Sequence, residues 1–231
     1  MIRLAALLAL SAGAAQAEIT SAEYQDPTSI YGHGVVPGGE YARLSFTLSN
    51  GTTLSTDAVG GVYEDTAPRL VDLDGDGSPE VITVFAHANA GAAIRVWDES
   101  EDGTTVELMA EGDPIGRRFR WLAVIGAADL DGDGTIEIAY VDRPHLAKTL
   151  RIVRIDGDGL IEVASFAGVT NHRIGEPDIA GGIRDCGAGP EMLVASSSWT
   201  ELLAVTYDGE FSAMTLGTDT SRPAFNRALA C

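Results

Sequence analysis

The stretch 72-DLDGDGSPE-80 decides the fold, because it returns as 129-DLDGDGTIE-137, 57 residues further along the chain. Each copy carries acids at loop positions 1, 3, 5 and 9, and glycines at positions 4 and 6 allow the sharp bends between them. Carboxylates gathered so closely are favourable only when a cation neutralises them. Their all-oxygen donor set favours calcium over zinc, copper or magnesium. We therefore expect two bound calcium ions.

An EF-hand begins in the same way, but it requires a bidentate glutamate at loop position 12. Thr83 and Tyr140 occupy that position here, and β-branched and aromatic runs follow at 81–84 and 138–141. These runs are typical of strands, so each loop is expected between two strands. An acidic surface turn without metal remains the alternative.

The first 17 residues predict a secretory signal peptide, with Arg3 at the start, an apolar run at 4–10 and the small-residue exit Ala15-Gln16-Ala17. Cleavage would leave a mature chain of residues 18–231, exported to a bacterial periplasm or secreted. No later segment is apolar enough to span a membrane. The net charge of −19 argues against nucleic acid and anionic membrane surfaces as partners.

Cys186 and Cys231 are the two cysteines of the chain. In an oxidising compartment a pair predicts one disulfide, which would tether the C-terminal residue. Two free thiols or a redox pair are the alternative, although the spacing matches no CxxC pattern.

A third, degenerate copy of the loop lies at 182–195, which aligns with 71–84. It keeps Asp185 and Glu191, but Ile183 and Gly187 replace the first and third acids, so we expect no metal there. After each loop the pattern predicts strand, turn, strand, tight turn and strand; the third repeat shows it best, with strands at 121–128, 138–141, 150–155 and 160–166. A hairpin is expected at 41–58. The chain then divides into modules at about 18–65, 66–122, 123–176 and 177–231 of a single domain.

DxDxDGxxE between the first two strands of a four-stranded repeat resembles the FG-GAP or VCBS repeat of integrin alpha-subunit propellers and secreted bacterial proteins. The resemblance implies an all-β, β-propeller-like array of about four four-stranded blades, with calcium loops between the first and second strands of two blades. Related propellers commonly have seven blades. We expect a small four-bladed ring, with an incomplete ring closed by dimerisation or an irregular stack as alternatives. The implied calcium ligands are Asp72, Asp74, Asp76, the Ser78 carbonyl and Glu80, then Asp129, Asp131, Asp133, the Thr135 carbonyl and Glu137.

The strand order of a propeller places the turns between second and third strands, and the connections between blades, on the face opposite the calcium loops. This loop face would bind a protein or an anionic small-molecule or glycan ligand, because arginines suit carboxylates and a tryptophan offers a stacking surface. Histidines holding a transition metal, and ordinary polar loop residues, are the alternatives. The residues concerned are His33, His87, Arg118, Arg143, His145, His172, Arg173 and Trp199.

Two functions compete. The first is a calcium-stabilised interaction module without chemistry of its own. The second is a periplasmic hydrolase or lyase acting on the loop face, where Asn171, His172, Arg173 and Glu176 form the most catalysis-like cluster. No serine-hydrolase elbow, zinc-protease helix or phosphate loop appears in the sequence, so enzymatic activity stays open, with the binding module favoured. Trp97, Trp121 and Tyr140 are expected in the core.

Overall fold

The computed structural model describes residues 17–100 and 102–231, so nearly all of the predicted signal peptide lies outside the described residues. The described chain is almost entirely strand. The N-terminal unit consists of β1 (Ile19–Pro27), β2 (Glu40–Leu48), β3 (Thr53–Asp57) and the short β4 (Gly61–Glu64). β2 and β3 form the expected hairpin, and β4 links β2 to the next unit by pairing with β6.

Three four-stranded antiparallel units follow, each with its strands paired in chain order. This is the order that the sequence pattern predicts. The second unit is β5 (Arg69–Val71), β6 (Glu80–His87), β7 (Gly91–Glu99) and β8 (Val106–Glu111). The third is β9 (Leu122–Ala128), β10 (Glu137–Asp142), β11 (Thr149–Asp156) and β12 (Gly159–Ala167). The fourth is β14 (Gly182–Asp185), β15 (Pro190–Ser196), β16 (Leu202–Tyr207) and β17 (Phe211–Gly217), with β13 (Val169–Thr170) added beside β15.

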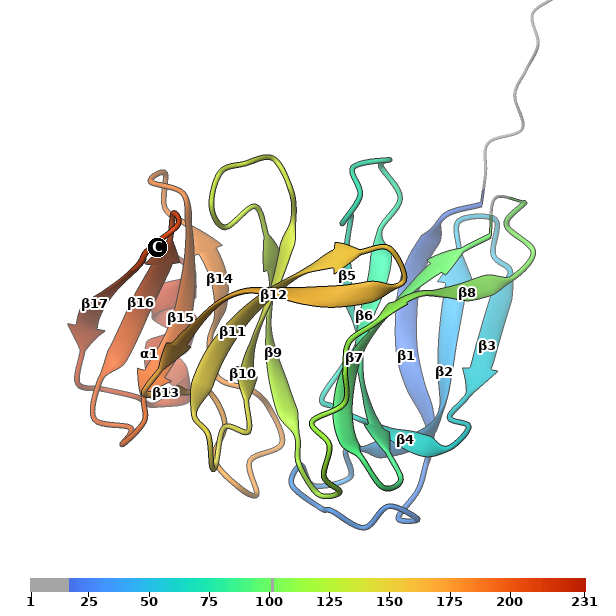
Figure 1. The fold of residues 1–231 in the computed structure, drawn as a ribbon, viewed down its shortest axis with the longest axis horizontal. Helices are drawn as coiled ribbons and strands as arrows, with labels where there is room; N and C mark the ends of the chain where they lie inside the picture. Colours follow the sequence, from blue (N-terminus) through green and yellow to red (C-terminus); the bar gives the residue numbers. More distant parts are fainter. Residues whose placement is uncertain (1–16, 101) are drawn as a thin grey trace, which may run out of the picture.

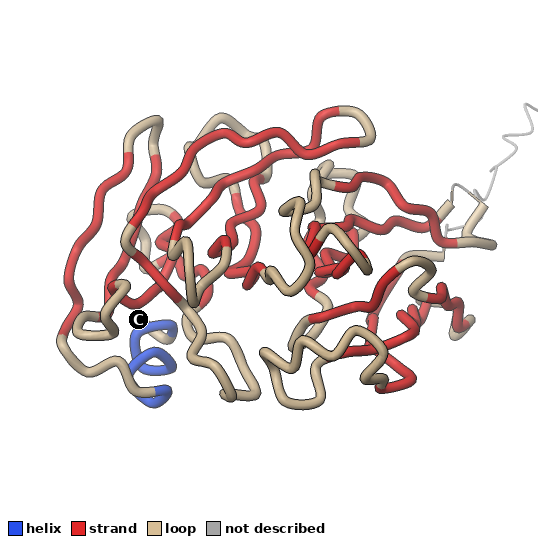
Figure 2. The backbone as a smooth tube through the Cα atoms, turned by 60° about the horizontal axis from the view of Figure 1, so that its bottom comes forward, coloured by secondary structure: helices blue, strands red, loops and turns tan. Residues whose placement is uncertain are grey.

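The units form a curved row in which β3 and β17 lie at opposite ends (Figure 1). In the described chain no β ladder joins the first unit to the fourth. Figure 2 brings the lower end of the molecule in Figure 1 toward the viewer and shows loops lying between these two end units. The nearly all-β, propeller-like class is confirmed, while the closed ring of four blades stays a prediction.

Apolar packing between the units stabilises the row. Ile94 and Val96 of the second unit pack with Trp121 and Val124 at the start of the third in one buried cluster. A second cluster fills the space between the third and fourth units. Because the inner strands are covered on both faces, β6 is buried along almost its whole length, which explains its continuous apolar run. Trp97 and Trp121 are buried as expected, whereas Tyr140 is only partly buried.

A short C-terminal helix, α1 (Arg222–Leu229), was not predicted from the sequence. Its Phe225 packs on Leu193 and Ala195 of the fourth unit, and this tertiary contact stabilises a helix too short to form alone. The predicted disulfide between Cys186 and Cys231 is confirmed, and it joins the end of the chain to the loop between β14 and β15. Among the described residues, none of the helices has the length and apolarity required to span a lipid bilayer.

Candidate metal centres and the opposite loop face

The first acidic loop connects β5 to β6 and is folded by its own carboxylates. Asp72 accepts hydrogen bonds from the backbone N–H groups of Gly75 (2.7 Å) and Gly77 (3.1 Å). Asp74 Oδ1 accepts from Asp76 N at 3.1 Å. Both glycines have positive φ, which allows the two tight bends at low steric cost. The oxygens of Asp72, Asp74 and Glu80 thereby gather within 4.8 Å of one another.

The second loop, between β9 and β10, repeats this geometry. Asp129 accepts from Gly132 N (2.8 Å) and Gly134 N (3.1 Å), and the oxygens of Asp129, Asp131 and Glu137 gather within the same 4.8 Å. The remaining predicted acids stand slightly apart. Asp76 and Asp133 are absent from these groups, and each accepts a hydrogen bond from the backbone N–H two residues later. The hydroxyl of Ser78 donates to Glu99 at 2.5 Å.

The glutamates that end the two loops are the most buried of the gathered acids. Glu80 is 1% exposed and Glu137 is 0% exposed, and each carboxylate accepts a bond from the backbone N–H of a loop leucine. Burial, with the charges of Asp74 and Asp98, raises the pKa of Glu80 to about 7. Burial likewise raises the pKa of Glu137, and its Oε1 has no hydrogen-bond partner. A buried carboxylate oxygen without a partner, aimed into a cluster of acids, fits a cation ligand. The acidic groups can therefore hold a metal ion.

In the third loop an arginine pairs with the glutamate that ends the loop. Asp185 Oδ1 accepts from Gly187 N (2.7 Å) and Gly189 N (3.1 Å), so the turn resembles the other two. Its glutamate, Glu191, instead accepts a 2.7 Å hydrogen bond from Arg184 Nε. The same guanidinium donates to the carbonyl of Ala228 in α1. The Arg184 guanidinium thus compensates the charge of Glu191, whereas the equivalent carboxylate of the second loop, Glu137, has an oxygen without a partner.

The residues beside the two intact loops differ in charge. Arg154 Nη1 lies 3.1 Å from Asp133 Oδ2 beside the second loop. Asp98 stands beside the first loop, where burial and the charges of Glu99, Asp74 and Asp76 raise its pKa to about 6. The first loop therefore has the more negative surroundings.

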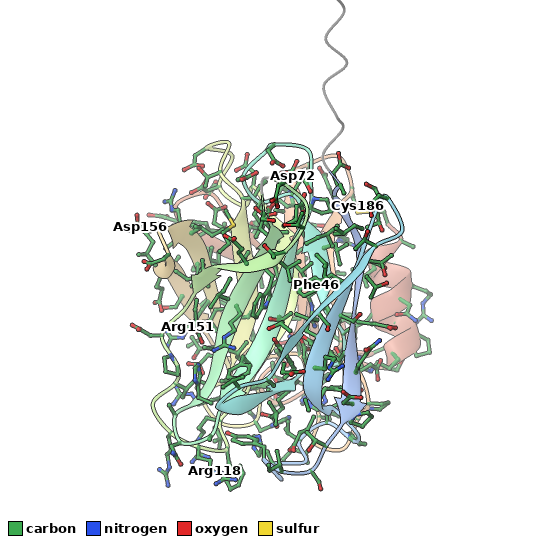
Figure 3. All side chains as sticks on the ribbon, turned by 90° about the vertical axis from the view of Figure 1, so that its right-hand side faces the viewer. Phe46, Asp72, Arg118, Arg151, Asp156 and Cys186 are labelled. Carbon is green, nitrogen blue, oxygen red and sulfur yellow. A yellow bond between two sulfur atoms is a disulfide. The ribbon has the colours of Figure 1, made fainter. Side chains whose placement is uncertain are left out.

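The predicted loop face lies at the other end of the molecule. Figure 3 shows Asp72 and Cys186 toward one end and Arg118 at the opposite end. The structure divides the predicted ligand-face residues into several small groups. His33, His145 and Trp121 line a cavity of about 30 Å³, which holds about one water molecule. His87 lies apart in the second unit and pairs with Glu111 at 2.6 Å.

His145 and His172 contact each other directly. His145 Nε2 lies 3.0 Å from His172 Nδ1, and His172 Nε2 lies 2.9 Å from the carbonyl of Glu176. Because a carbonyl only accepts, His172 Nε2 carries a proton and His145 Nε2 donates to His172 Nδ1. Burial lowers the pKa of both histidines, to about 4 for His145, so the pair is neutral at pH 7. His33 Nδ1 approaches the buried Glu64 to 2.7 Å, but without hydrogen-bond alignment.

The arginines of the loop face are already engaged. Arg173 lies 3.7 Å over the ring of Trp199 and also pairs with Glu176. Arg118 packs over the ring of Phe119 at 4.5 Å and donates to the carbonyl of Tyr31. These contacts tie the loops of different units together. An anionic ligand would therefore meet arginines whose positions are fixed by aromatic rings.

Several non-glycine residues of these loops have positive φ. The angles are 57° at Phe119, 45° at Arg143, 52° at Lys148 and 59° at Trp199. Such conformations cost free energy and persist only where neighbouring contacts hold them. At Lys148 the contact is a 2.6 Å hydrogen bond from its Nζ to the carbonyl of Ser197 in the fourth unit. The loop face is thus a constrained surface.

Sequence reasoning missed a cleft of about 310 Å³ between the second and third units. Asp142 accepts hydrogen bonds there from Arg143 (2.7 and 2.8 Å) and from Arg151 (3.0 Å), and Arg151 also pairs with Glu162. Burial raises the pKa of Tyr140, which lines the same cleft, to about 12. Arg143, predicted for the loop face, is part of this network. The residues come from two units, so no local pattern in the sequence indicated the cleft.

Residues 72–140 match the family model described as an FG-GAP-like repeat. The match begins at the first acid of the first loop and ends in β10, just after the second loop. Together with the propeller-like fold, it supports an FG-GAP repeat protein. Among curated proteins, no sequence matches this chain.

Proposed function

We propose that this chain is an exported, β-propeller-like interaction module in which each intact acidic loop holds one structural calcium ion. The observation that carries the metal assignment is the contrast between Glu137 and Glu191. Glu137 is fully buried with an unpartnered oxygen, whereas Glu191 at the equivalent place has an arginine. A cation at the first two loops supplies the compensation that Arg184 supplies at the third.

Calcium suits these loops because their donors are all oxygens, and because calcium accepts several carboxylate ligands in a flexible coordination geometry. Asp72, Asp74 and Glu80 would hold the first ion, and Asp129, Asp131 and Glu137 the second. Asp76, Asp133 and the carbonyls of Ser78 and Thr135 complete the proposed sets. Since each set spans the end of one strand and the start of the next, the ion joins two strands of a unit and stabilises their pairing.

Export is supported by the disulfide, which persists in oxidising compartments, and by the predicted leader. The binding role is supported by the loop face, whose side chains are fixed by contacts between units. The histidines that would serve an enzyme are dispersed. His145 pairs with His172, His87 pairs with Glu111, and the cavity lined by His33 and His145 has about 30 Å³, which is too small for a substrate. We therefore favour an interaction module over a hydrolase or lyase.

Elemental analysis tests the metal assignment. The disulfide-intact chain, equilibrated with calcium and then freed of unbound ion, should retain two calcium ions per chain. Asp74→Ala and Asp131→Ala should each lower this number by one. Retention of both ions by either variant would show that the loop assignment is wrong.

The binding role is tested separately at the loop face. We expect an anionic oligosaccharide, such as a uronic-acid tetrasaccharide, to shift the amide resonances of loops near Arg118 and Arg173. Arg118→Glu and Arg173→Glu should weaken these shifts, while Arg227→Glu on the exposed side of α1 serves as the matched charge control. Shifts that persist in both loop variants would contradict the assignment of this face.

A further inference from the structure

This inference rests on the proposed calcium loops and concerns the difference between them. In the second unit Val81 pairs with Trp97, so continuing the register places Glu80 opposite Asp98. In the third unit Ile138 pairs with Val153, which places Glu137 opposite Arg154. The two positions are therefore structurally equivalent. One loop has an aspartate beside its buried glutamate, and the other has an arginine.

The neighbouring positions extend the contrast. Asp98 pairs with Glu107 on β8, whereas Arg154 pairs with Ile161 on β12. The residue after Asp98 is Glu99, a buried acid that accepts the Ser78 hydroxyl, and the residue after Arg154 is Ile155. Among the described residues, Asp98 belongs to no ion pair, so no side-chain cation offsets its charge.

Arg154 acts on the second loop in two ways. Its guanidinium lies 3.1 Å from Asp133, so an incoming ion must compete with it for that carboxylate. Its positive charge also repels any cation in the loop, because like charges at this range interact even through the high dielectric of a partly exposed site. Asp98 has the opposite effect on the first loop.

We propose that the two loops bind calcium unequally, with the first loop filling at lower calcium because Asp98 and Glu99 attract the ion, and the second filling later because Arg154 repels it. We expect at least a tenfold difference in Kd, which corresponds to about 1.4 kcal/mol. Asp98 and Arg154 are positioning residues that set affinity through charge.

The third loop completes this series. There the positive side chain is Arg184 of β14, the strand that precedes the loop, and it forms a hydrogen bond with the glutamate that an ion would otherwise contact. The first loop thus has an additional acid, Asp98, beside it, and the second has a neighbouring arginine, Arg154. In the third, Arg184 pairs with the glutamate in place of an ion. At intermediate calcium only the first loop, which lies in the second unit, would be fully occupied. The second and third units would therefore gain stability at different calcium concentrations.

Calorimetric titration of calcium into the decalcified, disulfide-intact chain tests the proposal. The wild type should give two resolved binding steps, and Asp74→Ala should abolish the tighter one. Arg154→Asp should strengthen the weaker step at least tenfold, and Arg154→Gln should do so by a smaller factor. Asp98→Arg should weaken the tighter step. Arg227→Asp, which makes the same charge change on α1, should alter neither step by more than about twofold, because distant exposed charges are screened by salt.

The outcomes separate the two claims. Two steps of equal affinity in the wild type, or equal responses to Arg154→Asp and Arg227→Asp, would overturn the inequality while leaving calcium binding intact. Absence of any binding step in the wild type would overturn the calcium loops and this inference together. Melting curves in chelator identify any variant that fails to fold, and the Arg154→Gln variant, at a partly exposed side chain, provides the independent measurement.

Discussion

Replacing Asp131 by Asn isolates the contribution of one ion to stability. Asp131 Oδ1 accepts a hydrogen bond from Asp133 N at 3.1 Å, and the amide oxygen of Asn can accept the same bond. The loop therefore keeps its internal geometry but loses one negative charge and one anionic metal ligand. We expect little change in the melting temperature of the metal-free chain and a large change in the effect of calcium.

The size of the effect follows from linkage between binding and folding. An ion present at about 100 times its Kd and bound only by the folded state contributes about 2.7 kcal/mol. For a chain of this length each kcal/mol corresponds to roughly 2–4 °C in Tm. At a calcium concentration of about 100 times the Kd of the second loop, the ion in that loop should raise the Tm of the wild type by about 5–11 °C, and Asp131→Asn should remove this part of the calcium-dependent increase.

Differential scanning calorimetry with and without a chelator measures these shifts. Asp185→Asn is the matched control, because Asp185 makes the same kind of turn hydrogen bonds in a loop whose glutamate is paired with Arg184. Its calcium-dependent shift should equal that of the wild type. The reasoning is refuted if the chelator leaves the wild-type Tm unchanged, or if Asp185→Asn reduces the calcium effect as much as Asp131→Asn does.

Three further outcomes are expected. Changing Cys186 and Cys231 together to Ser removes a link across 45 residues and should lower the free energy of unfolding by about 4 kcal/mol in urea titrations, with faster amide exchange in α1; an unchanged urea midpoint would contradict this. Burial and the neighbouring His172 lower the pKa of His145 to about 4, below the unfolded value of about 6.5. The stability that the neutral imidazole contributes is therefore complete above about pH 6.5 and is lost as the pH falls toward 4. The Tm difference between wild type and His145→Gln should shrink across this window, and a constant difference would argue against the neutral pair. Trp121→Phe leaves a buried carbonyl of β4 without its 2.7 Å indole partner and should cost about 1–3 kcal/mol in urea unfolding, whereas a cost near zero would mean that the bond is dispensable.

Much of the fold could be predicted because its signals are local. The acids of each loop and the glycines between them specify a turn wherever they occur, and the β-branched runs after them specify strands. The tight turn between the strands predicted at 150–155 and 160–166 is local in the same way, and the structure has it where Asp156 pairs with Gly159. α1 was missed because its eight residues are held by Phe225 against a distant strand rather than by their own propensity.

The candidate sites divide in the same way. Asp72 and Glu80 were recognisable because only seven residues lie between them, and a loop this short keeps the two carboxylates close together. The loop face was harder. His145 and His172 were predicted to share a face, but their hydrogen bond depends on how two connections from different units pack around Trp121.

The sequence by itself determined that this protein has two acidic oxygen-rich turns, a degenerate third, and strands in a repeating order, because each depends on residues adjacent in the chain. Only the tertiary structure decided what surrounds those turns. Asp98 and Arg154 come beside the acids through cross-strand register, and Arg184 meets α1 across 44 residues of chain. Electrostatic interactions act through space, so the charge around each loop is set by pairing and packing that no local pattern specifies.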